Sequence, residues 1–176
     1  FVDMKDSDII SQLVGAYSGL SSDVTATNTS YKELVQYYCT DWDFILTRAE
    51  ANGFLVTADA GKVSVKAPQV ESEPVLTLTY GIDLISFGAD VDATAQFSVV
   101  KGFAWSPTDQ AIQEAQAGPN QLTGQGDLAA DTLAGVIAPN YFRLQTSVPL
   151  DNSTLTDWVK GQQVKSGLAR IRGHAA

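Results

Sequence analysis

The sequence predicts an α+β fold from two patterns of apolar residues. Near both ends of the chain, over residues 7–19 and 151–168, apolar residues recur at the spacing of one helix face. Between these ends, from Phe54 to Trp105, apolar and polar residues alternate as they do in strands. The period changes directly after Asn52-Gly53, a pair that is typical of a helix end.

The first predicted element is a short amphipathic helix with Ser7 as its candidate N-cap. Gly19 is placed to end this helix, and its apolar face consists of Ile10, Leu13, Val14 and Tyr17. The polar, β-branched stretch 21–30 lacks a helical period, and it therefore predicts a loop or a weak edge strand.

The second predicted helix has two possible starts, because Ser30 with Glu33 and Thr40 with Asp43 both match a capping box. Thr40 is preferred, since the helix that follows it has an apolar face of Trp42, Ile45, Leu46 and Ala49. Residues 34–38 are rich in strand formers and are expected to be extended.

The strand-like part begins with a hairpin, in which residues 54–58 and 63–66 flank a turn. Residues 75–105 predict three strands, the last with a face of Phe97, Val99, Phe103 and Trp105 that we expect to be buried. Residues 110–117 are compatible with a helix or a strand, and 118–126 predict a loop. A helix over 151–168, with Asp151, Asn152 or Ser153 as its cap, and the start of a strand end the chain.

The charge balance argues against two classes of partner. The 176 residues include 11 Lys and Arg against 20 Asp and Glu, a formal net charge of −9, which disfavours nucleic acid and anionic membranes. Cys39 is the single cysteine and cannot form an intramolecular disulfide. With no signal-peptide pattern at the start, we expect folding in the cytoplasm. The first residue is Phe1, and we expect the chain to be a fragment of a longer polypeptide.

No combination of residues predicts catalysis, so we expect no catalytic, cofactor-binding or metal-binding residues, no cofactor and no enzyme activity. The single histidine, His174, lies at the end of the chain, which disfavours Ser-His-Asp and Cys-His chemistry and a zinc site. Asp90-x-Asp92 resembles the start of a calcium loop, but Lys101 occupies the position of the bidentate Glu. Asp41 and Asp43 lie two residues apart on a helix and cannot converge on one bond.

The aromatic residues around the second helix offer an alternative, a sugar-stacking surface formed by Tyr37, Tyr38, Trp42 and Phe44. Because Trp42 shares the apolar face with Ile45, packing in the core is preferred. Cys39 is likewise expected to be a small buried residue. Gly124-x-Gly126 follows no predicted strand, which disfavours a phosphate site.

The order of segments resembles the VgrG (Rhs-element Vgr) family, the spike hubs of type VI secretion systems, which are related to contractile phage tail hubs. The resemblance covers residues 6–173, and its most specific part is "VQYYCTDWDFILTRAEANGFLV", followed by "VVKGFAWSPTDQAIQEAQA" and "VPLDNSTLTDWVKGQQVKSGLARIRG". Ser106 replaces an acidic residue that is usual in the family. The resemblance favours a strand for residues 110–117 and implies a tail-hub-like α+β fold, with short helices packed on an antiparallel, barrel-like sheet.

The resemblance also implies a function. The chain would be a non-enzymatic hub subunit that forms a homotrimer in the full-length protein, caps a hexameric secreted tube and helps to puncture target envelopes. Its other partners would be a spike-tip protein, the baseplate and effectors, and it would be injected without a signal peptide. Residues 1–72 would form a helical and hairpin segment, 73–150 a barrel-like domain, and 151–176 the helix and strand before an OB-like domain. The alternatives are a hub of a phage tail or another injection machine, a carbohydrate-binding β-module, and an enzyme that uses Asp41 or Asp43.

Overall fold

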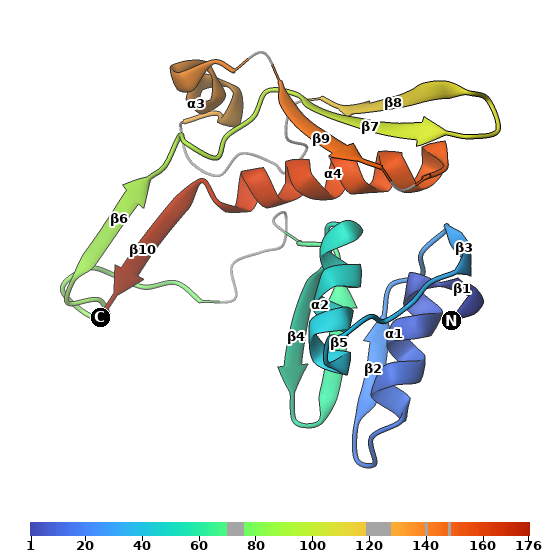
Figure 1. The fold of residues 1–176 in the computed structure, drawn as a ribbon. Helices are drawn as coiled ribbons and strands as arrows, with labels where there is room; N and C mark the ends of the chain where they lie inside the picture. Colours follow the sequence, from blue (N-terminus) through green and yellow to red (C-terminus); the bar gives the residue numbers. More distant parts are fainter. Residues whose placement is uncertain (70–75, 119–127, 140, 148) are drawn as a thin grey trace.

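The computed structural model describes residues 1–69, 76–118, 128–139, 141–147 and 149–176, which form an α+β fold (Figure 1). The helices are α1 (Asp6–Gly15), α2 (Asp41–Ala51), α3 (Ala130–Ile137) and α4 (Asn152–Leu168). The strands are β1 (Val2–Lys5), β2 (Ser21–Val24), β3 (Ser30–Glu33), β4 (Leu55–Asp59), β5 (Lys62–Lys66), β6 (Phe87–Val91), β7 (Val100–Ser106), β8 (Ala111–Ala117), β9 (Phe142–Thr146) and β10 (Ile171–Ala175). They pair as β1-β3, β2-β5-β4, β8-β7-β9 and β10-β6, and only β2-β5 and β7-β9 are parallel.

The first core lies between α1, α2 and the sheet β2-β5-β4. It buries one apolar stripe of each helix and the inward residues of β5, which are Ile9, Ile10, Leu13, Val14, Phe44, Ile45, Ala49, Val63 and Val65. Alternate residues of β5 point into this core, as expected for a strand with one covered face. Phe1 stacks on Phe44 with the ring centroids 5.7 Å apart, so the N-terminal residue belongs to this core.

The second core lies between α4 and one face of the sheet β8-β7-β9, and it is built on small residues. Leu155 and Val159 of α4 are fully buried against Val100, Ala104, Ala115 and Ala117. A Cβ atom on Gly102 would lie 2.6 Å from Val159 Cγ1 and 2.8 Å from Leu155 Cδ1. The helix can therefore approach β7 this closely only because residue 102 is glycine.

Helix α4 also connects the two cores. Its residue Gly161 lies against the end of α2, where a Cβ would come within 2.9 Å of the Glu50 carbonyl oxygen. Lys165 forms an ion pair with Glu50 beside this crossing. After α4 the chain continues into β10, which pairs with β6 in a two-stranded ribbon that leads away from the sheet β8-β7-β9 (Figure 1).

Several predicted elements are confirmed. Thr40 is the N-cap of α2 and accepts a hydrogen bond from the Asp43 N–H at 3.1 Å. Gly53 follows that helix with a left-handed φ of 69°. Asp151 caps α4 in the same way, by accepting from the Thr154 N–H. The hairpin β4-β5, the strand over 111–117, the edge strand β2 and the final strand β10 are also present.

Other boundaries were predicted wrongly. Ser7 is not a cap but lies inside α1, where its backbone N–H donates to Thr27 Oγ1, and the helix ends at Gly15, before Gly19. Residues 34–38 form no strand, since β3 ends at Glu33. Residues 76–80 have no strand either, only an isolated bridge at Tyr80, so the described part of 75–105 contains two strands. No sequence pattern predicted α3 or β9.

Two buried faces were also assigned wrongly. Trp42, expected in the core, is 45% exposed, and Leu46 is exposed as well, because α2 turns Phe44, Ile45 and Ala49 inward. On β7 the buried face holds Val100, Gly102, Ala104 and Ser106, the residues next to the predicted Phe103 and Trp105. Phe97, which precedes β7, does pack on the second core, as predicted. Small side chains, rather than the large rings of Phe103 and Trp105, allow α4 to pack closely there.

The remaining expectations concern larger regions. Residues 119–126 of the predicted loop, with Gly124-x-Gly126, lie outside the described residues. The described strands form open sheets of two or three strands, with no closed barrel among them. The division of the chain at residues 72 and 150 stays a prediction.

Candidate functional site

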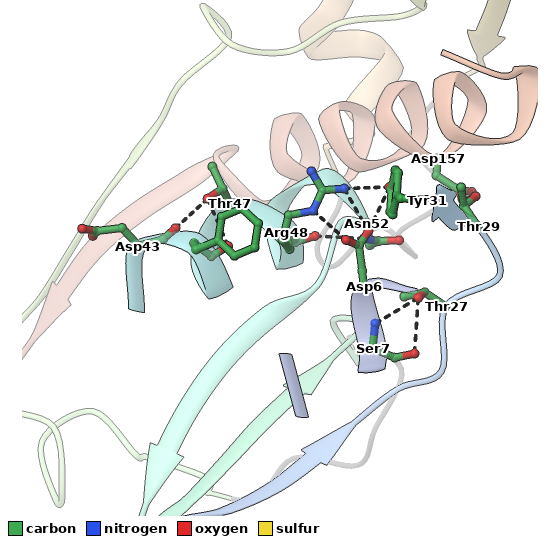
Figure 2. Close-up of polar contacts among 11 residues, drawn as sticks. Asp6, Ser7, Thr27, Thr29, Tyr31, Asp43, Thr47, Arg48, Asn52 and Asp157 are labelled. Atoms are coloured by element: carbon green, nitrogen blue, oxygen red, sulfur yellow. Dashed lines mark hydrogen bonds and ion pairs between the residues drawn. The ribbon is translucent and has the colours of Figure 1, made fainter. Parts of the chain in front are cut away.

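A buried charge cluster joins α1, α2 and β3 (Figure 2). Asp6 at the start of α1 is 2% exposed, and it faces Arg48 of α2, whose side chain is 17% exposed. Arg48 donates from Nε to Asp6 Oδ1 at 2.6 Å and from Nη2 to Asp6 Oδ2 at 3.0 Å. Tyr31 and Asn52 also donate to Oδ2, at 3.1 and 2.8 Å. Four hydrogen bonds thus satisfy one buried carboxylate.

The electrostatics of this cluster keep the Arg48 guanidinium charged. Burial by itself lowers the pKa of Arg48, but its hydrogen bonds to Asp6 and the negative charge of Asp6 raise that pKa above its ordinary value. Burial raises the pKa of Tyr31 to about 12, and the neighbouring Asp6 adds to the effect although Arg48 opposes it. At neutral pH the cluster therefore contains a charged guanidinium group and a neutral phenol.

The surroundings of the cluster continue towards α4. The Thr29 hydroxyl oxygen, just before β3, lies 2.7 Å from Ser153 Oγ and also donates to Asp157 Oδ2 of α4. Figure 2 shows Thr29 and Asp157 beside the cluster. A groove of about 380 Å³ lies beside Arg48 and Asn52, with Leu150, Asp157 and Trp158 on its other side. Asp6 itself is enclosed by its donors, which fits a role in holding three elements together and not a role as an accessible acid or base.

No sequence pattern identified Asp6 or Arg48 as site residues. Their signal is weak, because an acid in the first turn of a helix is explained by the helix dipole. Arg48 was placed off the apolar face of its helix, where an arginine is normally solvated. Only the tertiary fold, which brings residues 42 positions apart into contact, identifies the pair.

Asp41 and Asp43, the candidate carboxylate pair, contact different groups. Asp41 accepts from Gln36 Nε2 at 2.8 Å and from Tyr17 Oη at 2.7 Å, and these hydrogen bonds lower its pKa. Asp43 accepts from the Thr40 hydroxyl at 2.7 Å. Both acids therefore stabilise the start of α2, and the structure gives them no shared target.

The aromatic segment before α2 is exposed, contrary to the prediction of core packing. Tyr38 is 100% exposed with φ of 50°, and Tyr37 is also exposed. Cys39, expected to be buried, is exposed too. The chain crosses the surface here between β3 and α2, so only Phe44 of the four rings reaches the core. Exposed rings are the condition that the carbohydrate-binding alternative requires.

The possible metal ligands do not gather in one place. Asp90 lies in β6, and Asp92 Oδ1 accepts from the Thr94 N–H at 2.8 Å in the turn that follows this strand. Within the described residues there is no group of three or more His, Cys, Asp or Glu side chains suited to a metal ion. His174 lies against Gly88 in the β6-β10 ribbon. Among the described helices, none is long and apolar enough to cross a membrane.

The fold of the chain is similar to the folds of phage tail proteins. A tail protein from Neisseria meningitidis MC58 aligns with 99% of this chain at a TM-score of 0.61 and 15% identity. The 43 kDa tail protein of prophage MuSo2 from Shewanella oneidensis aligns with 99% at a TM-score of 0.63 and 10% identity. The chain spans about half of each of these proteins, 51% and 50% of their lengths.

The sequence itself, compared with models of protein families, identifies the family of the chain. The model of the Alg8 N-terminal domain matches residues 1–176, and the chain belongs to this family. No curated protein matches the chain.

Proposed function

We propose that the chain is a non-enzymatic structural subunit of a contractile, phage-tail-like injection apparatus, in the role of a trimeric spike hub. The observation that carries the proposal is the fold, because two tail proteins align with nearly the whole chain at TM-scores of 0.61 and 0.63. The resemblance to VgrG in "VQYYCTDWDFILTRAEANGFLV" supports the narrower assignment to a type VI secretion hub. A hub of a phage tail or of another contractile injection machine is the alternative within this class.

The proposed role needs shape and contacts instead of a reactive centre. The buried charges of Asp6 and Arg48 are used in holding α1, α2 and β3 together, and Asp41 and Asp43 stabilise the first turn of α2, which Thr40 caps. The subunit would fold in the bacterial cytoplasm, cap a hexameric tube, contact a spike-tip protein and the baseplate, and leave the cell through the apparatus. It would use no cofactor.

The experiment that tests this role is a binding assay between the complete polypeptide that carries these residues and the tube protein of the same apparatus. The proposal predicts that the two co-elute as one complex with three hub copies on one tube hexamer. Failure of the hub and the tube protein to associate would contradict it.

A carbohydrate-binding module remains the second candidate, because Tyr37, Tyr38 and Trp42 are exposed. Aromatic rings that face solvent can stack on sugars. Glycan-array binding that disappears in a Tyr37→Ala, Tyr38→Ala, Trp42→Ala triple variant would favour this candidate over the hub.

A further inference from the structure

One face of the sheet β8-β7-β9 is left uncovered in the described structure. Helix α4 covers the face that carries Val100, Gly102 and Ala104, and the intervening residues point to the opposite side, which we name the outer face. Trp105 of β7 and Ile112 of β8 are opposite each other in the register of the strands. They are 46% and 65% exposed, so the outer face presents large apolar side chains to solvent.

The outer face also holds a cation without a polar partner. Arg143 of β9 lies over the Phe103 ring, with its Cζ 4.4 Å from the ring centroid. In the part of the chain that the structure describes, Arg143 forms no hydrogen bond or ion pair, whereas Lys101 on the same face is 2.8 Å from Glu114. Phe103, Trp105, Ile112 and Arg143 line one groove of about 270 Å³. A guanidinium group in such a setting is suited to a carboxylate, which it can bind with two parallel hydrogen bonds.

A second exposed surface has the opposite charge. In the 80–87 segment, Ile82, Ile85 and Phe87 are exposed, Ile85 at 82%. Asp83 lies among them and forms no side-chain hydrogen bond or ion pair within the described residues. The segment has a defined shape, because the N–H groups of Ile85 and Ser86 both donate to the Ala176 carbonyl oxygen.

The two surfaces match in composition but do not meet within one molecule. The outer face belongs to the sheet that packs on Leu155 and Val159, in the first half of α4, whereas the 80–87 segment lies beside β10, which follows the other end of that helix (Figure 1). Each surface surrounds one unpaired charge with exposed apolar side chains, and the charges are opposite. Large apolar patches of this kind mark protein contacts.

We propose that the 80–87 segment of one copy binds the outer face of β8-β7-β9 in a second copy, with Asp83 opposite Arg143. The contact uses different surfaces on the two copies, and repetition of such a contact closes into a ring if the rotation permits. That the ring contains three copies rests on the proposed hub function, whereas the choice of surfaces rests on exposure and charge alone.

The test is the association of this chain, measured by sedimentation equilibrium for the wild type and two charge-reversal variants. Arg143→Glu and Asp83→Arg each bring like charges together and should weaken association at least tenfold. The two changes combined in one chain should restore association. The two single variants mixed in equal amounts should restore it in part, because every contact between unlike variants pairs opposite charges, whereas a ring of three keeps one contact between like variants. Lys32→Glu makes the same change of charge at an exposed site on β3 and should have no effect.

The outcomes separate this inference from the proposed function. Association that neither Arg143→Glu nor Asp83→Arg changes would overturn the inference, and a hub that assembles through other surfaces would remain. A wild-type chain that stays monomeric at every accessible concentration would also overturn the inference. The outer face would then bind a different protein and not a second copy. Recovery in the mixture of single variants would support it, because only a contact between these two different surfaces predicts that recovery.

Discussion

Replacing Asp6 by Asn should remove much of the stability of the fold. The substitution keeps the size of the side chain but leaves Arg48, only 17% exposed, without its counter-ion. It also places an amide N–H₂ group in a position that now accepts hydrogen bonds from Arg48, Tyr31 or Asn52. Breaking a buried ion pair by removing one partner costs about 3–5 kcal/mol. For a chain of this size, that corresponds to a decrease of roughly 6–20 °C in Tm.

The assay is urea unfolding followed by circular dichroism, with Asp8→Asn as the matched control. Asp8 lies in the same first turn of α1 but is exposed, so its loss removes only the helix-dipole effect of about 0.3–1 kcal/mol. A double variant, Asp6→Leu with Arg48→Met, should lose much less than the sum of the two single variants, because no charge is left unpaired. Equal losses for Asp6→Asn and Asp8→Asn would refute the reasoning.

Three further predictions follow from packing and charge. Gly161→Ala should lower the Tm in thermal unfolding. Overpacking against the end of α2 costs about 1–3 kcal/mol, whereas the higher helix propensity of alanine gains only about 1 kcal/mol. An unchanged or raised Tm would argue against the close crossing of α2 and α4. In chemical unfolding, Phe44→Ala should lower the free energy of unfolding by about 3–5 kcal/mol, because Phe44 is buried. Trp42→Ala should lower it by only about 1 kcal/mol, because Trp42 is half exposed. The reverse order would mean that α2 buries the side with Trp42. The pKa of Asp23 is lowered to about 2 by hydrogen bonds from Lys62 and Lys66, which lie at the two ends of β5. Because the folded pKa lies below the ordinary value of 3.8, the stability from this group is present above about pH 4 and is lost as the pH falls towards 2. NMR titration should show the low midpoint and its rise in Lys62→Met, and an ordinary midpoint in the wild type would contradict the pairing.

Local signals in the sequence predicted both ends of α2, the start of α4 and the hairpin, but not the ends of α1. Thr40 and Asp151 are caps that act on N–H groups three residues away, so the neighbouring sequence contains all the required information. The turn of the hairpin is likewise local, with Ala60 and Gly61 at positive φ. The fold class, predicted from the periods of the apolar residues, is confirmed as well.

Which side of an element is buried could not be predicted in the same way. On α2, the predicted apolar stripe with Trp42 and the observed buried stripe with Phe44 share Ile45 and Ala49. Arg48, whose side chain is only 17% exposed, made the observed stripe look polar in the sequence. On β7, the larger side chains suggested the wrong face, because the partner of that strand is a helix that needs Gly102 for its close approach. Both choices depend on residues far away in the sequence, Asp6 in one case and Leu155 in the other.

A measurement of the solution mass of the complete polypeptide that carries these residues is the best test of the proposed trimeric hub. Multi-angle light scattering gives this mass without reference to shape. A trimeric hub would have three times the mass of one polypeptide, maintained on dilution through the concentrations at which the tube protein binds. The mass of a single polypeptide under the same conditions would contradict the hub and would direct attention to the exposed rings of Tyr37, Tyr38 and Trp42.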